Sequence, residues 1–213
     1  MSIPISINWP IPNVAAICAL QDTAGAANLL INGSLASGIT NPTVTFNGFS
    51  RKVSLTSANN LSGINFTING QLNGQAISET LVGPNANTVA TTNNFDAIFS
   101  IHVNGAVTQV SVGTGTTGQI HWIKHNTHTT VAQIAIGATV VGTINYSYQI
   151  SLEDVTTISS PNVFGPIPAM TGATTTQFSV TSLIVANYSR ILINSSGANG
   201  ALTFDFIQQG ILG

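Results

Sequence analysis

Residues 64–69 have the sequence INFTIN, and this alternation of large apolar and small polar side chains decides the fold. A period of two is typical of a β-strand with one face in a core and the other face exposed. The same alternation recurs at 53–56, 144–150 and 202–206. The best helix candidate, 24–30, is short and contains a glycine, which disfavours a stable helix. The sequence therefore predicts an all-β protein built from antiparallel strands.

Turn signals divide the predicted strands at short intervals. The Asn-Gly pairs are Asn32-Gly33, Asn47-Gly48, Asn69-Gly70, Asn73-Gly74, Asn104-Gly105 and Asn199-Gly200. Because Asn-Gly accepts the positive φ of a tight turn, we expect many of these pairs to form hairpins.

The number of predicted strands exceeds what one simple sandwich holds, and the Gly- and Thr-rich stretch 113–118 has the composition of a flexible linker. We therefore predict an extended N-terminal arm at 1–13, followed by two antiparallel β-sandwich domains, jelly-roll or Ig-like, at 14–115 and 116–213.

Charged side chains are scarce, since they make up 5% of the 213 residues against about 25% in an ordinary soluble domain. Four Lys and Arg residues are too few for a nucleic-acid interface, and no apolar run reaches the length of a membrane-spanning helix. We therefore expect neither a nucleic-acid nor a membrane partner. The few charges are expected at turns and strand edges, and the surface is suited to being covered by other subunits. The single cysteine, Cys18, is expected to be a small buried hydrophobe.

Three of the four histidines fall together, at His121, His125 and His128. On a helix this spacing would place the imidazoles on one face, where they could hold Zn²⁺ or Ni²⁺. The neighbouring Asn and Thr residues favour an extended chain, in which only His121 and His125 share a face. We therefore expect no metal and no other cofactor here, and we place the segment at a subunit contact. A metal shared across a symmetry axis is the alternative.

No nucleophile elbow, phosphate-binding loop, dinucleotide fingerprint or Cys-based metal motif occurs in the sequence. A glycosidase needs two facing carboxylates, whereas the adjacent Glu153 and Asp154 would point to opposite sides of a strand. The histidine cluster has no acid beside it in the sequence. We therefore predict a protein that is not an enzyme and has no catalytic residues.

Two segments are candidates for contacts with partner subunits. The first is the proline-rich arm with Trp9 and Ile11, which would pack on its own domain or reach a neighbouring subunit. The second runs from His121 through Trp122 to His128. An exposed Trp122 could instead stack on a sugar, whereas Tyr146 and Tyr148 share an apolar strand face and are expected in the core.

A set of segments in fixed order carries a resemblance to a known family. The block 51–70 leads into GQAISETLVGPN at 74–85, SVGTG follows at 111–115, and RILIN at 190–194 precedes LTFDFIQQG at 202–210. Together they resemble a family of small β-rich virion structural proteins of tailed bacteriophages, and GQAISET is the most specific motif.

The resemblance covers roughly residues 15–213 and implies a component of the virion, made in the host bacterial cytoplasm and incorporated by self-assembly. The expected function is that of a capsid decoration or cement protein, with the major capsid protein or other virion proteins as partners and with homo-oligomer formation. A neck or tail ring component is an alternative. In another class, a receptor- or glycan-binding adhesin would use Trp122 and the loop 159–171.

Overall fold

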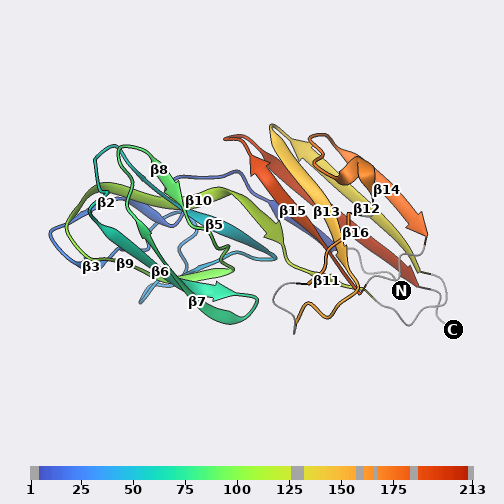
Figure 1. The fold of residues 1–213 in the computed structure, drawn as a ribbon, viewed down its shortest axis with the longest axis horizontal. Coiled ribbons are helices and arrows are strands. Elements are labelled where there is room, and N and C mark those ends of the chain that lie inside the picture. Colours follow the sequence, from blue (N-terminus) through green and yellow to red (C-terminus); the bar gives the residue numbers. More distant parts are fainter. Residues whose placement is uncertain (1–4, 126–131, 157–160, 166, 183–186, 211–213) are drawn as a thin grey trace. The chain divides into compact units, whose positions relative to one another are not determined.

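The computed structural model describes residues 5–125, 132–156, 161–165, 167–182 and 187–210 (Figure 1). The prediction of an all-β protein is confirmed: the paired strands are antiparallel, and helical structure in the described residues is limited to the 3₁₀ turn η1 (Pro168–Met170). The chain forms two compact units. The N-terminal unit is 12–118, and the C-terminal unit combines 1–11 with 119–213.

The N-terminal unit contains two groups of strands. The first has the order β3-β9-β6-β7, with β4 pairing β9 as well. In the second, β10 pairs with β2 and borders β5, which pairs with β8. Their bounds are β2 (Cys18–Thr23), β3 (Ala27–Asn28), β4 (Val44–Thr45), β5 (Phe49–Ser57), β6 (Asn65–Leu72), β7 (Gln75–Val82), β8 (Thr88–Ala90), β9 (Ala97–Val103) and β10 (Val107–Ile120).

The predicted alternation explains how the N-terminal unit builds its core. In β6, Phe66 and Ile68 are buried while Thr67 and Asn69 are half-buried. In β5 nearly every residue is buried, because both faces of this strand are covered. The Phe46 and Phe49 rings stack with centroids 5.7 Å apart at the junction of β4 and β5. Apolar burial of this kind contributes about 1.5–3 kcal/mol for each large side chain.

The C-terminal unit also contains two groups of strands. One sheet has the order β1-β16-β12-β14, and in the other group β15 pairs with β13 and β11. Their bounds are β1 (Ile5–Trp9), β11 (Ile123–Lys124), β12 (Ala132–Val141), β13 (Ile144–Ser151), β14 (Gln177–Ser182), β15 (Tyr188–Ser196) and β16 (Ala201–Gly210).

Aromatic side chains fill the space between these two groups. The Tyr148 ring on β13 meets the Phe204 ring on β16 with centroids 6.4 Å apart. Tyr146 and Tyr148 are both buried, as their shared apolar face predicted. Burial disfavours the phenolate and raises the pKa of each tyrosine to about 12.

The stretch 113–118 is not a flexible linker, so that part of the prediction is wrong, although the two units divide directly after it. All six residues lie inside β10, and the chain passes from one unit to the other after Gly118, within this strand. A Cβ on Gly113 would lie 2.1 Å from the carbonyl oxygen of Asn13. Gly113 therefore lacks a side chain so that two backbone segments can lie close together, and its role is not to provide flexibility.

The expected N-terminal arm forms strand β1, which pairs along its length with β16 from Ile5 opposite Phe206 to Trp9 opposite Leu202. Residues 1–4 lie outside the described part of the chain. The first strand of the chain thus completes a sheet of the C-terminal unit and is not a free arm in this structure.

Candidate functional site

The structure separates the three clustered histidines into different settings. His125 is buried, its Nε2 lies 2.8 Å from Ser189 Oγ, and its ring stacks on Phe206 with centroids 5.1 Å apart. His121 is half-buried between β10 and β11, and His128 lies outside the described residues. In the described part of the chain, no three His, Cys, Asp or Glu residues are grouped so that they could hold a metal ion. His125 therefore packs inside its unit, in contrast to the contact role expected of it.

Trp122 takes part in a small polar cluster around Arg190. The Arg190 Cζ lies 4.3 Å from the centre of the Trp122 ring, a cation–π geometry. The same guanidinium donates to Gln149 Oε1 at 2.9 Å and to Gln119 Oε1 at 2.5 Å. Burial lowers the pKa of Arg190 to about 10. One face of the indole is thus occupied by the guanidinium, which leaves that face unable to stack on a sugar.

The two contact residues expected in the arm differ in exposure. Trp9 is 1% exposed and belongs to the core, so it does not present a surface to a partner in this structure. Ile11 is 49% exposed and remains available for contact. Of the two alternatives for the arm, packing on its own domain or reaching a neighbouring subunit, the structure shows the first for Trp9, whose strand pairs with β16.

Several charged residues lie inside strands that are not edges, against the expectation that charges lie at turns and edges: Arg51 and Lys52 on β5, Arg190 on β15 and Asp205 on β16. Arg51 on β5 is fully buried, and its guanidinium donates to the carbonyl oxygen of Gly115 at 2.8 Å. Burial lowers the pKa of this guanidinium to about 9. This contact ties β5 to β10, so Arg51 has a structural role inside the N-terminal unit.

Most of the carboxylates stabilise loops and turns by accepting hydrogen bonds. Four of them accept hydrogen bonds from backbone N–H groups of distant segments: Asp22 from Gln109, Glu79 from Thr92 and Asn93, Asp96 from Asn73, and Glu153 from Asn162. Asp154 accepts from the hydroxyl and the backbone N–H of Thr156, which holds the pKa of its carboxyl below the ordinary value. A glycosidase acid needs a raised pKa, so Asp154 lacks the environment for that role.

The two outer strands of the four-stranded sheet carry no charge. β1 and β14 are its two edges, and neither contains a charged residue. Natural edge strands are usually protected by lysine, proline or a bulge, because their unpaired backbone groups can accept another strand. On β14, Phe178 is 72% exposed. The sequence does not indicate that this strand is an edge, because only the sheet order shows it.

No helix in the described residues has the length and apolar character needed to cross a membrane. Comparison of the chain with protein-family models, with curated proteins and with solved structures finds no match.

Proposed function

We propose that this chain is a non-enzymatic structural protein of a bacteriophage virion, a decoration or cement protein that binds the outside of the shell and stabilises it. The motifs at 74–80 and 111–115 supply the virion part of the proposal through their family resemblance. In this proposal each unit is a β-sandwich of the jelly-roll or Ig-like type. The observation that carries the assembly part is the absence of charge from the edge strands β1 and β14.

An uncharged edge favours assembly for a physical reason. A strand from another subunit can pair with the exposed N–H and C=O groups without removing a charge from water. The exposed Phe178 beside this edge adds apolar area that a neighbour would cover. Each such contact is weak, but many copies on a repeating shell add their contacts through multivalency.

The partners in this proposal are the major capsid protein or other virion proteins and further copies of the chain. The protein would be made in the host bacterial cytoplasm and end in the virion. A neck or tail ring component would use the same edges, and copy number separates the two. Hundreds of copies per particle indicate a shell protein, while six or twelve indicate a ring.

Quantitative mass spectrometry of purified particles, produced from the genome that encodes the chain, tests the proposal. We expect the chain among the particle proteins at hundreds of copies relative to the major capsid protein. A copy number of six or twelve would support the ring alternative. Particles that lack the chain altogether would contradict a virion role.

Charge introduced at the edges is expected to weaken assembly. Phe178→Lys places a charge on exposed β14, and Ser6→Lys places one on β1 opposite Asp205, with which the lysine can pair. We expect at least a tenfold loss of self-association or particle binding, since about 1.4 kcal/mol gives tenfold. Sedimentation or binding to stripped particles would measure it.

Phe164→Lys is the matched control for this experiment. Phe164 is 51% exposed in the same unit but lies outside the two edge strands, bridging to Ile150 on β13. Unchanged assembly in Phe178→Lys and Ser6→Lys, or an equal loss in the control, would contradict the role of the edges.

A further inference from the structure

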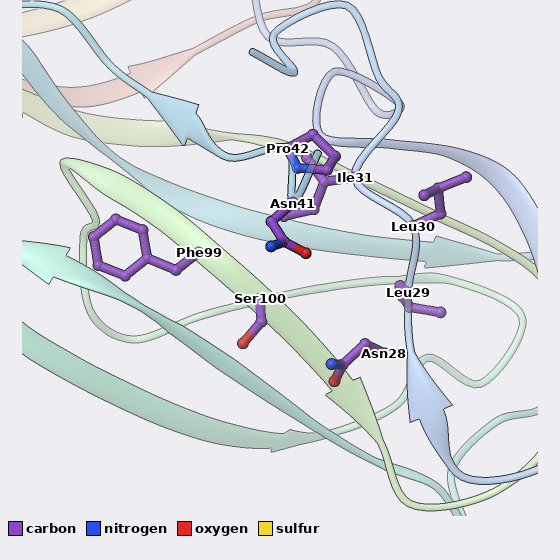
Figure 2. Close-up of a pocket in the computed structure, with 8 residues that line it drawn as sticks. All are labelled: Asn28, Leu29, Leu30, Ile31, Asn41, Pro42, Phe99 and Ser100. Carbon is purple, nitrogen blue, oxygen red and sulfur yellow. The ribbon is translucent and has the colours of Figure 1, made fainter. Parts of the chain in front are cut away.

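A pocket of about 250 Å³ opens in the N-terminal unit beside strand β9 (Figure 2). The residues that line it are Asn28, Leu29, Leu30, Ile31, Asn41, Pro42, Phe99 and Ser100. Asn41 and Ser100 lie between Phe99 on one side and Asn28, Leu29 and Leu30 on the other (Figure 2). All of them belong to one unit and none is charged.

The pocket exists because the outer edge of β9 changes partner. β4 pairs with β9 at Ala97 and Ile98, whereas β3 pairs with it at His102 and Val103. Between these positions, neither β3 nor β4 pairs with Phe99 or Ser100. Paired strands close the gap on both sides, so its walls are already in place without a ligand.

Proline ends the β4 pairing at this point. Continued in register from Val44 opposite Ile98, the pairing would place Pro42 opposite Ser100. Pro42 has no N–H to donate, so the ladder cannot continue there. Thr43 pairs instead with Ser37, through hydrogen bonds of 2.8 and 2.9 Å in both directions. The loop therefore turns away from β9 and leaves Asn41 and Pro42 as one wall of the pocket.

A β-bulge turns Phe99 outward. On the other side of β9, Asn69 pairs with Ser100 and Gly70 pairs with Ile98, so Phe99 is the extra residue. Ile98 and Ile101 are fully buried, while Phe99 is 49% exposed. Bulges commonly redirect a side chain beside a functional site. Here the bulge places an aromatic ring at the rim of the pocket.

The polar groups of the pocket are amides and a hydroxyl. Asn69 Nδ2 donates to Ser100 Oγ at 3.1 Å, which leaves the Ser100 hydroxyl proton available for a ligand. Within the described residues, the carboxamides of Asn28 and Asn41 have no hydrogen-bond partner. Both can donate and accept. The lining thus offers an aromatic face together with neutral donors and acceptors.

We propose that this pocket binds one uncharged sugar ring. A pyranose has an apolar C–H face that can pack on Phe99 and hydroxyl groups that can bond to Asn28, Asn41 and Ser100. The absence of lining charge disfavours an ionic ligand, because its charge would lose water without a partner. The volume lies below the roughly 300–1,000 Å³ of pockets for drug-sized ligands, which fits a single ring.

An extended peptide fits this gap poorly. Adding a strand to a sheet needs a continuous free edge, and here β3 and β4 occupy the edge on both sides of two residues. The site is separate from the edges β1 and β14, so the inference goes beyond the proposed assembly function and does not rest on it.

Ligand-observed NMR on the full chain tests the proposal, with methyl glycosides of glucose, galactose, mannose and N-acetylglucosamine as probes and glucuronic acid as the charged comparison. We expect at least one neutral glycoside to bind with a Kd in the millimolar range and glucuronic acid to bind more weakly. A polysaccharide containing the preferred residue is the second arm. If the polysaccharide binds more tightly per sugar unit than the glycoside, the natural ligand is a surface glycan. If the affinity per sugar unit is equal, the natural ligand is the free sugar.

Matched variants assign the binding to this pocket. Phe99→Ala should weaken binding by about fivefold or more through loss of the aromatic face, whereas Phe178→Ala, an exposed phenylalanine of the other unit, should have no effect. Asn41 has a φ of 54°, so Asn41→Gly removes the carboxamide without backbone strain. Asn73→Gly, at a φ of 50° in the β6–β7 turn, is its control.

Three results would overturn the proposal. The first is the absence of saturable binding by every neutral glycoside at tens of millimolar. The second is preferential binding of the charged sugar. The third is unchanged affinity in Phe99→Ala and Asn41→Gly, with both variants folded by circular dichroism.

Discussion

Trp9→Ala is expected to lower the free energy of unfolding of the C-terminal unit by about 3–5 kcal/mol, the range typical of truncating a buried tryptophan or phenylalanine. Trp9 is 1% exposed and lies opposite Leu202 in the β1–β16 pairing, so the change leaves a large cavity at the end of a sheet edge. Since whole domains are stable by about 5–15 kcal/mol, this is a major fraction of the total. Urea unfolding followed by far-UV circular dichroism would measure it.

Ile11→Ala provides the control, because Ile11 is in the same N-terminal segment and 49% exposed. We expect its effect to stay within about 0.5 kcal/mol. An equally small effect of Trp9→Ala would contradict the packing of β1 on β16 within the chain. If β1 were instead exchanged between copies, the unfolding midpoint of the wild-type protein would rise with protein concentration.

The strand pattern was predictable because side-chain alternation is a local property, but the connections were not. Only Asn73-Gly74 among the six Asn-Gly pairs forms a hairpin between adjacent paired strands, with φ of 50° and 77°. Asn104-Gly105 and Asn47-Gly48 connect strands of different sheets, and Asn69-Gly70 lies inside β6. An Asn-Gly pair indicates that the backbone can adopt the positive φ of a turn. It does not indicate which strand the next strand pairs with, because that depends on residues distant in the sequence.

Strand boundaries were hard to predict for the same reason. The alternation at 144–150 predicts the strand that β13 forms, but it does not show that Gly142, with φ of 69°, turns the chain between β12 and β13. The stretch 24–30, where a glycine and short length disfavour a helix, contains β3. In both places short segments follow the pairing available in the sheet, which outweighs local propensity.

The candidate sites were less predictable than the strands. His125 and Trp9 were candidates for contacts with partner subunits, yet both are buried. Phe99 was not singled out, because alternation alone does not reveal a bulge. Its exposure depends on the pairing of β9 with β6, at a point where glycine lets the two strands approach. The edge character of β14 is likewise a property of the sheet order.

Gly70→Ala is expected to destabilise the N-terminal unit by about 3 kcal/mol, at the upper end of the usual cost of overpacking. A Cβ on Gly70 would lie 2.1 Å from the carbonyl oxygen of Ala97 and 2.7 Å from the Phe95 ring. Neither neighbour can move freely, because one is backbone of β9 and the other is a fully buried ring. Chemical denaturation would measure the loss, with Gly63→Ala as control, since no atom lies within 4 Å of a Cβ at that position.

The same substitution tests the link between the bulge and the pocket. Gly70 pairs with Ile98, directly beside Phe99, so any shift of β9 that relieves the clash changes the bulge that turns Phe99 outward. We therefore expect Gly70→Ala to alter the NMR signals of the Phe99 ring and of Ser100, while Gly63→Ala leaves them unchanged. A Gly70→Ala variant with wild-type stability and unaltered Phe99 signals would show that β9 and β6 do not approach as closely as described. The bulge could then not be the reason for the exposure of Phe99.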